Sequence, residues 1–231
     1  MVLVLFDIDG TLITSGGTGR RAIAQALSDF CNHPVDMSTI PLGGRTDPAI
    51  VRDILKQANF TDEEIPELLE PCLALYTKEL ERVIRPDNIT ILPGVLPLLN
   101  QLHEDPNYSL ALITGNMQQT AYMKLGAGNL SSFFPCGGFG SDHENRNELP
   151  LVARDRAAAW YKKAFNPDKT IVIGDTEHDI TCSKHFGSWS IGVSTGMSSW
   201  ESLEAMNPDL LLSDLAQERA LWAFLQSILD R

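Results

Sequence analysis

The sequence predicts an α/β fold: a doubly wound parallel sheet (Rossmann-like core) with an inserted α-helical cap domain. Short, continuous apolar runs alternate with helical patterns, as in parallel sheets that helices cover on both faces. This alternation also implies right-handed crossover connections. Between the first two apolar runs lie about a hundred residues, far more than one crossover needs, and most of them have a helical pattern.

Five apolar runs are expected to form the strands, because each ends abruptly at a polar or glycine-rich turn. The runs are Val2–Phe6, Leu110–Ile113, Ile171–Ile173, Trp189–Val193 and Leu210–Leu212. The helices expected around this sheet are Val95–Glu104, Met117–Leu125, Leu149–Phe165 and Leu215–Leu229.

The long segment between the first two strands is predicted to hold further helices. A first helix follows Gly16-Gly17, and Asp47-Pro48 suits the N-cap and first-turn proline of a second helix over Ala49–Asn59. Thr61–Glu64 is a capping box that opens a third helix, which Pro71 is expected to kink or break. We therefore expect an α/β core of residues 1–14 and 93–231 and a helical cap domain of residues 15–92. Gly16-Gly17 at one join and Pro93-Gly94 at the other suit a hinge.

Composition and charge limit the partners. The 231-residue chain has 43% hydrophobic residues, which is enough for a sizeable core. Its 30 acidic and 18 basic residues give a net charge of −12, and such a surface repels nucleic acid and anionic lipid. Four scattered cysteines, without a C-x-x-C pair, suit reduced thiols. With no apolar stretch near membrane-spanning length, we expect a cytoplasmic protein that binds no membrane or nucleic acid. We expect a monomer, because a cap that must open is hindered by a large interface.

Two carboxylates follow the first predicted strand. Asp7 and Asp9 are two residues apart at the strand end, so both point to one side and place two acids around one site. One can act as nucleophile or metal ligand and the other as proton donor. Gly10 lets the chain turn sharply and bring backbone N–H groups toward an anion. The competing interpretation is an ordinary charged loop after a strand.

Two more strand ends carry polar groups, and open parallel sheets bind ligands at the carboxyl ends of their strands. Asp175 and Asp179 follow Ile171–Ile173, and a hard cation such as Mg²⁺ prefers carboxylate oxygens from separate chain segments. The alternative for Asp179 is that it caps the helix that follows. Thr114-Gly115-Asn116 offers a hydroxyl and amides at a helix N-terminus, which suits a phosphate, although this tripeptide is also ordinary turn chemistry.

These three segments together resemble the haloacid dehalogenase superfamily, specifically its helical-cap phosphatases of the phosphoglycolate phosphatase and β-phosphoglucomutase-like branch. The matching segments are FDIDGTL at Phe6–Leu12, an apolar run ending in TGN at Leu110–Asn116, and IVIGDTEHDI at Ile171–Ile180. The resemblance covers essentially the whole predicted core, and the order of its motifs is highly specific.

The resemblance implies a role for each of these residues. Asp7 would be the nucleophile that forms an aspartyl-phosphate, and Asp9 the acid and base. Thr114, Gly115 and Asn116 would hold the phosphate. The cofactor would be Mg²⁺, bound by Asp7, the backbone carbonyl of Asp9 and Asp175, with Asp179 supporting it from behind.

One departure from the family pattern concerns a lysine that normally neutralises the phosphate and the nucleophile. The stretch between Gly126 and Asp155 contains no lysine. Arg146 is the best positional substitute and would join the phosphate-binding residues, because a guanidinium can do this electrostatic work with a more rigid fork. Arg154 and Arg156 are the rivals, and a solvated loop arginine is the alternative interpretation.

The cap is expected to supply substrate specificity, since a pocket closed at a domain interface is where small substrates are discriminated. Arg20 falls on the apolar stripe of the first cap helix, which fits either a substrate contact or a long side chain packed along the surface. Arg45, in the glycine-rich turn Gly43–Asp47, is the second candidate substrate contact. Asp47 is expected to serve only as an N-cap.

The leading hypothesis is a Mg²⁺-dependent phosphatase that hydrolyses a small-molecule phosphomonoester, that is, a phosphorylated metabolite, through an aspartyl-phosphate. The alternatives are a β-phosphoglucomutase-like phosphotransferase, a dehalogenase and a non-catalytic member of the superfamily. Asp9 argues against the dehalogenase, whose chemistry needs no acid two residues after the nucleophile. The sequence does not identify the phosphate ester.

Overall fold

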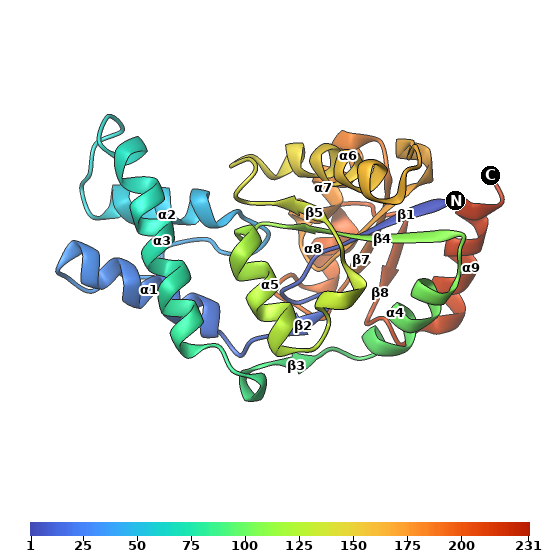
Figure 1. Ribbon diagram of the computed structural model, residues 1–231, viewed down its shortest axis with the longest axis horizontal. Coiled ribbons are helices and arrows are strands. Elements are labelled where there is room, and N and C mark those ends of the chain that lie inside the picture. Colours follow the sequence, from blue (N-terminus) through green and yellow to red (C-terminus); the bar gives the residue numbers. More distant parts are fainter.

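The computed structural model describes all 231 residues and contains a six-stranded parallel sheet flanked by helices (Figure 1). The strands are β1 (Val2–Phe6), β4 (Tyr108–Thr114), β5 (Gly137–Phe139), β6 (Thr170–Gly174), β7 (Trp189–Val193) and β8 (Leu210–Leu212). Their spatial order is β5-β4-β1-β6-β7-β8, and every neighbouring pair is parallel. The predicted α/β fold class is confirmed, and β1 lies in the middle of the sheet.

Helices pack on both faces of this sheet, as the alternation of side chains along β1 shows. Val2, Val4 and Phe6 belong to a large apolar cluster that also contains residues of α4 (Val95–Glu104) and α9 (Glu218–Leu229). Leu3 and Leu5 belong to a second cluster with α6 (Leu149–Tyr161) and Cys182 of α7 (Glu177–Phe186). Because strand residues alternate between faces, the continuous apolar run of β1 is buried on both sides.

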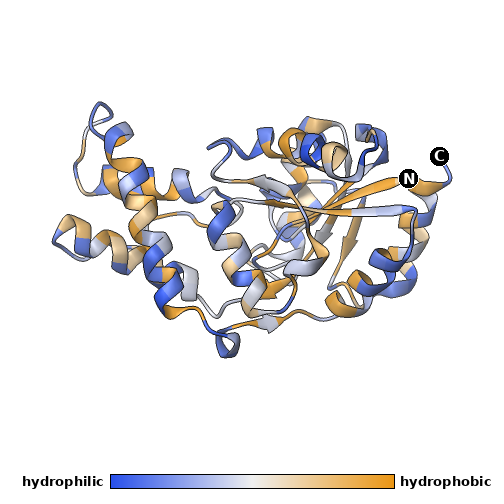
Figure 2. Ribbon diagram, viewed as in Figure 1, coloured by the Kyte–Doolittle hydropathy of each residue, from blue (hydrophilic) through white to orange (hydrophobic).

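A separate helical part is formed by α1 (Thr18–Cys31), α2 (Asp47–Gln57) and α3 (Ile65–Val83), which lie to one side of the sheet in Figure 1. Its apolar faces, visible in Figure 2, form a cluster of 15 buried residues that lies wholly between Ala22 and Leu80. The chain enters through β2 (Ile13–Thr14) and returns through β3 (Thr90–Ile91), which pair antiparallel. The helical part therefore has a core of its own, and the domain boundaries at residues 15 and 92 stay predictions.

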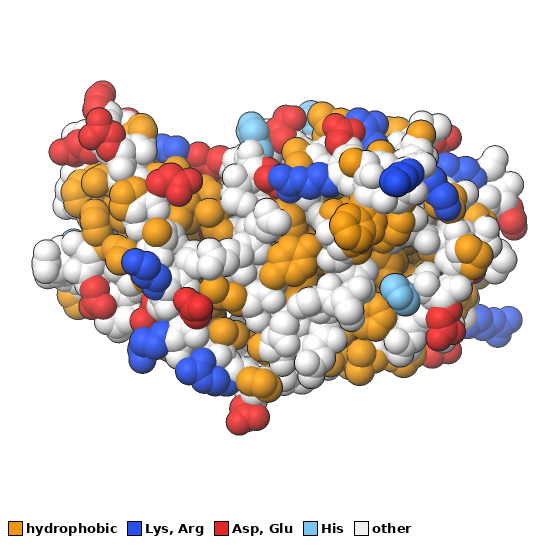
Figure 3. All heavy atoms as spheres, viewed as in Figure 1, with side chains coloured by type: hydrophobic (Ala, Val, Ile, Leu, Met, Phe, Trp, Pro, Cys, Tyr) orange, Lys and Arg blue, Asp and Glu red, His pale blue; other side chains and the backbone are white.

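The remaining helices are α5 (Gln118–Ala127), which follows β4, and the short α8 (Trp200–Ala205), which follows β7. None of the helices is long and apolar enough to cross a membrane. Acidic, basic and hydrophobic side chains are mixed over the face of the molecule that Figure 3 shows.

The structure departs from the sequence analysis in several details. The strand β5 was not predicted, because it has only three residues and two of them are glycines. Pro71 lies inside α3 without ending it. Pro71 and Glu67 are both exposed, so water can solvate the Glu67 carbonyl that the proline leaves without a donor. The N-cap of α2 is Thr46, whose hydroxyl accepts from the Ala49 N–H, so Asp47 is not the cap.

Candidate active site

Three loops meet at the carboxyl ends of the adjacent central strands β4, β1 and β6. The loop after β1 carries Asp7 and Asp9, the loop after β4 carries Asn116, and the loop after β6 carries Asp175. With the helical part they enclose a cavity of about 430 Å³. The predicted site residues that line it are Asp7, Asp9, Arg20, Arg45, Thr114, Gly115, Asn116, Arg146 and Asp175. Asp179 lies behind the cavity wall and is 1% exposed.

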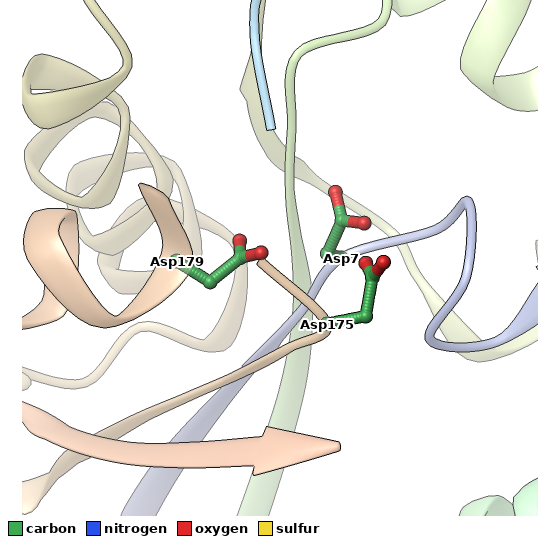
Figure 4. Close-up of side chains that lie close together, drawn as sticks. All are labelled: Asp7, Asp175 and Asp179. Atoms are coloured by element: carbon green, nitrogen blue, oxygen red, sulfur yellow. The ribbon is translucent and has the colours of Figure 1, made fainter. Parts of the chain in front are cut away.

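A buried cluster of three carboxylates lies at the base of the cavity. Asp7, Asp175 and Asp179 lie close together in Figure 4, with one oxygen from each within 4.8 Å of the others. Burial raises the pKa of Asp7, and the Arg146 guanidinium beside it acts in the opposite direction. Burial and the charge of Asp7 raise the pKa of Asp175 well above its ordinary value. Three crowded carboxylates with one guanidinium make a favourable environment for a hard divalent cation, so these donors fit Mg²⁺.

Arg146 is the cation of this cluster, and it comes from the turn that precedes α6. Its Nη2 donates to Oδ1 of Asp7 at 2.9 Å and to Oδ1 of Asp179, while its Nη1 donates to the Gly44 carbonyl at 3.2 Å. Burial opposes its charge, but Asp179 and Asp7 outweigh that cost and raise the pKa of Arg146. The side chain is only 6% exposed, so it balances the charge of Asp7 from inside the protein.

The two rival arginines are engaged elsewhere. Arg156 forms an ion pair with Asp142 and lies over the ring of Phe139, and Arg154 pairs with its neighbour Asp155. Neither lines the cavity. The geometry therefore favours Arg146 over both of them as the cation beside Asp7.

Asp179 takes part in capping α7 and also contacts Arg146, while its support of Mg²⁺ stays a prediction. Its Oδ2 accepts from the N–H of Thr176 at 3.1 Å and from the Thr176 hydroxyl at 2.6 Å, which completes a capping box at the start of α7. Its Oδ1 faces Arg146. One carboxylate thus fixes the helix that follows β6 and holds the arginine that contacts Asp7.

The loop after β4 is ordered by its own side chains. The Thr114 hydroxyl oxygen accepts from the Asn116 N–H at 3.3 Å and from the Asn116 side-chain amide at 2.7 Å. The same amide nitrogen donates to Oδ2 of Asp9 at 2.8 Å. The loop thereby connects the predicted phosphate-binding residues to the second aspartate of β1.

A lysine in the site was missed by the sequence analysis. Lys124, on α5, is 4% exposed, and its Nζ lies 2.6 Å from Oδ2 of Asp9 and 2.6 Å from Oδ1 of Asn116. A search limited to the residues after Gly126 passes over it. The available signal was the spacing of Thr120 and Lys124, because polar residues four apart share one face of a helix.

The two cap arginines line the cavity but are bonded within the helical part. Arg20, which is exposed, donates to the Met37 carbonyl at 3.1 Å, and Arg45 pairs with Asp53. The backbone at Arg45 packs directly onto Gly115, where an added Cβ would lie 2.0 Å from the Arg45 carbonyl oxygen. The loop that carries Arg45 therefore rests on the loop after β4.

Asp47 joins the same two loops. Its Oδ2 accepts from the Met117 N–H at 2.9 Å, at the start of α5, and its own N–H donates to the Gly115 carbonyl at 2.7 Å. Burial raises the pKa of the Asp47 carboxyl to about 6, and Lys124 acts against this rise. Instead of capping its own helix, Asp47 caps a helix of the core.

Residues 4–193 match the family model described as haloacid dehalogenase-like hydrolase. The chain belongs to this family. It is 25% identical to the pyrophosphatase PpaX of Anoxybacillus flavithermus, over 92% of this chain and 93% of that protein. It is 26% identical to a phosphoglycolate phosphatase of Haemophilus influenzae, over 93% of this chain and 95% of that protein. A crystal structure of a β-phosphoglucomutase from Clostridium difficile has the same fold, with a TM-score of 0.73 at 20% identity, covering 100% of this chain and 98% of that one.

The predicted family is confirmed. The predicted enzyme class, a phosphoric monoester hydrolase, agrees with the names of the sequence relatives.

Proposed function

We propose that this protein is a Mg²⁺-dependent phosphatase that hydrolyses a small-molecule phosphomonoester through an aspartyl-phosphate on Asp7. The observation that carries the proposal is the placement of Asp7. It belongs to the buried group of three carboxylates, it contacts Arg146, and it follows the central strand β1. Relatives named pyrophosphatase and phosphoglycolate phosphatase support hydrolysis of a phosphoric ester or anhydride.

The first step uses Asp7 as nucleophile and Asp9 as acid. A carboxylate oxygen of Asp7 attacks phosphorus, the bond from phosphorus to the ester oxygen breaks, and Asp9 gives that oxygen a proton. In the second step Asp9 takes a proton from water, and the water oxygen attacks the phosphorus of the aspartyl-phosphate. Inorganic phosphate leaves and Asp7 is restored. Asp9 suits this role because its side chain is 40% exposed and lines the cavity.

The remaining residues hold charge in place. Asp7, Asp175 and the backbone of Asp9 would hold Mg²⁺, which when bound offsets the charge of the phosphoryl oxygens. Thr114, Gly115 and Asn116 would donate hydrogen bonds to those oxygens. Arg146, which contacts Asp7, would balance their negative charge.

The helical part, residues 15–92, would act as the cap, with Arg20 and Arg45 reaching the rest of a small phosphorylated metabolite. A β-phosphoglucomutase-like transfer shares the fold but has no support from the names of the two sequence relatives. We infer a protein that acts as a monomer in the cytoplasm.

Replacing the nucleophile tests the proposal. We expect the wild-type protein with Mg²⁺ to release inorganic phosphate from members of a panel of phosphate esters, and Asp7→Asn to lower turnover by at least about 10³-fold because the amide cannot form the acyl phosphate. Asp87→Asn, an exposed position outside the cavity, serves as the matched control. A wild-type protein without activity on the panel, or an active Asp7→Asn variant, would contradict the proposal.

A further inference from the structure

We propose that Lys124 is a positioning residue that fixes the carboxylate of Asp9 on the side of the cavity that receives the leaving group. The inference rests on the proposed function, in which Asp9 is the acid and base. It assigns work to a buried cation that the proposed chemistry does not otherwise use.

Lys124, Asn116 and Asp9 form a closed triangle of hydrogen bonds. The lysine ammonium donates to Asp9 and to Asn116, both at 2.6 Å, and the Asn116 amide donates to the same Asp9 oxygen at 2.8 Å. The other oxygen of Asp9, Oδ1, accepts no hydrogen bond from the protein, although the side chain is 40% exposed. Two donors therefore fix one oxygen of Asp9 and leave the other available to the cavity.

The helical part restricts the side chain of Lys124. α5 contacts α3 and lies beside the helical part in Figure 1. The first turn of α1 covers the ammonium so closely that a Cβ on Gly19 would lie 3.3 Å from Nζ and 3.7 Å from the Tyr76 hydroxyl. A lysine side chain is ordinarily flexible, and burial under Gly19 removes that freedom. Its position then transmits a fixed orientation to Asp9.

The other basic side chains that line the cavity bond to other groups, and Arg20 donates to the Met37 carbonyl. Arg146 is bonded to Asp7 and Asp179, and Arg45 pairs with Asp53. Lys124 is the only cation paired with Asp9.

The position of Asp9 suits phosphoryl transfer, in which the acid must approach the leaving oxygen. Attacking and leaving oxygens lie roughly in line on opposite sides of phosphorus, so a phosphate that faces Asp7 directs its leaving group away from the carboxylate cluster. Residues of the helical part line the rest of the cavity, and Lys124 lies there beside Gly19. A proton donor must approach the leaving oxygen to about 2.6–3.2 Å, and a carboxyl without a fixed rotamer meets this condition only part of the time.

Leaving-group dependence separates positioning of an acid from general damage. The constant kcat/KM reports the first chemical step, in which an alkyl ester needs a proton on its leaving oxygen and an aryl ester with an acidic phenol scarcely does. For Lys124→Met we expect kcat/KM to fall about 100-fold with β-glycerophosphate and less than about fivefold with p-nitrophenyl phosphate. Lys124→Arg should recover part of the loss because it retains a cation. Lys78→Met, at an exposed site on α3, should change neither constant.

Each other outcome is decisive. Equal losses with both esters, or a rise in KM with kcat unchanged, would mean a structural role or a substrate contact and would overturn the inference. Values of kcat/KM that stay unchanged for both esters in Lys124→Met would also overturn the inference. If Lys124→Met does not fold, as judged by circular dichroism, Lys124→Gln allows the same comparison of kcat/KM between the two esters. A wild-type protein that hydrolyses neither these esters nor the wider panel would overturn both the proposed function and this inference. If the wild type is active but Lys124→Met does not lose more kcat/KM with the alkyl ester than with the aryl ester, the inference alone is overturned.

Discussion

Arg146 and Lys124 each pair with one of the two aspartates at the end of β1, but their surroundings differ. The side chains of Arg146 and Asp7 are 6% and 8% exposed, and Asp179 is the second acid in contact with the arginine. The side chain of Lys124 is 5% exposed, whereas that of its partner Asp9 is 40% exposed and faces the cavity. One pair closes the base of the site, and the other holds an acid that remains open to substrate. The difference fits the roles that we propose, in which Asp7 is a fixed nucleophile and Asp9 an acid that approaches the leaving group.

The largest expected difference between the two pairs concerns stability. Arg146→Ala leaves Asp7 and Asp179 buried without a cation, so we expect the free energy of unfolding to fall by about 3–5 kcal/mol. Turnover should fall at least about tenfold, because the charge of Asp7 and the phosphate is no longer balanced. Urea unfolding and steady-state kinetics measure both quantities.

Arg154→Ala, which breaks a surface pair, is the control and should cost less than about 1 kcal/mol. An unchanged turnover in Arg146→Ala would move the role to another residue. A loss of stability in Lys124→Met as large as that in Arg146→Ala would erase the distinction between the pairs.

A smaller effect is expected at Asp47, the acid of the helical part that Lys124 also influences. Burial raises its folded pKa from 3.8 to about 6, so the folded state favours the protonated form. The stability that this proton provides is complete below about pH 4 and is lost as pH rises through about 6. Asp47→Asn removes the titration, so its stability relative to wild type should rise between these values by up to about 3 kcal/mol.

Urea unfolding at several pH values across this range measures the difference. Asp87→Asn is the exposed control. A constant difference between Asp47→Asn and wild type at every pH would contradict the raised pKa.

The smallest effect is the stabilisation of the carboxylate cluster by Mg²⁺. A cation that binds only the folded protein at ten times its dissociation constant adds about 1.4 kcal/mol, and thermal unfolding should shift up by about 3–5 °C. Asp175→Asn should reduce this shift because it removes a donor, whereas Asp36→Asn, an exposed position in the helical part, should retain it. A shift of equal size in Asp175→Asn would place the cation elsewhere.

Local patterns were sufficient for much of the fold. Val2–Phe6, Trp189–Val193 and Leu210–Leu212 were predicted with the bounds they have, because a buried parallel strand needs a continuous apolar run and little else. The strand β5 escaped because two of its three residues are glycines, and only the neighbouring strand makes it a strand. The helix α3 continues through Pro71 because Pro71 and Glu67 are exposed to water, and a local sequence pattern does not show exposure.

The sequence by itself determined which residues stand at the strand ends, since Asp7, Asn116 and Asp175 each follow an apolar run within three residues. Parallel strands then bring these residues to one edge of the sheet. Only the tertiary structure decided which cation meets which acid. Arg146 reaches Asp7 across 139 positions and Lys124 reaches Asp9 across 115. Contacts of that separation depend on how α5, the turn before α6 and the helical part pack together, and residue spacing along the chain carries no measure of such packing.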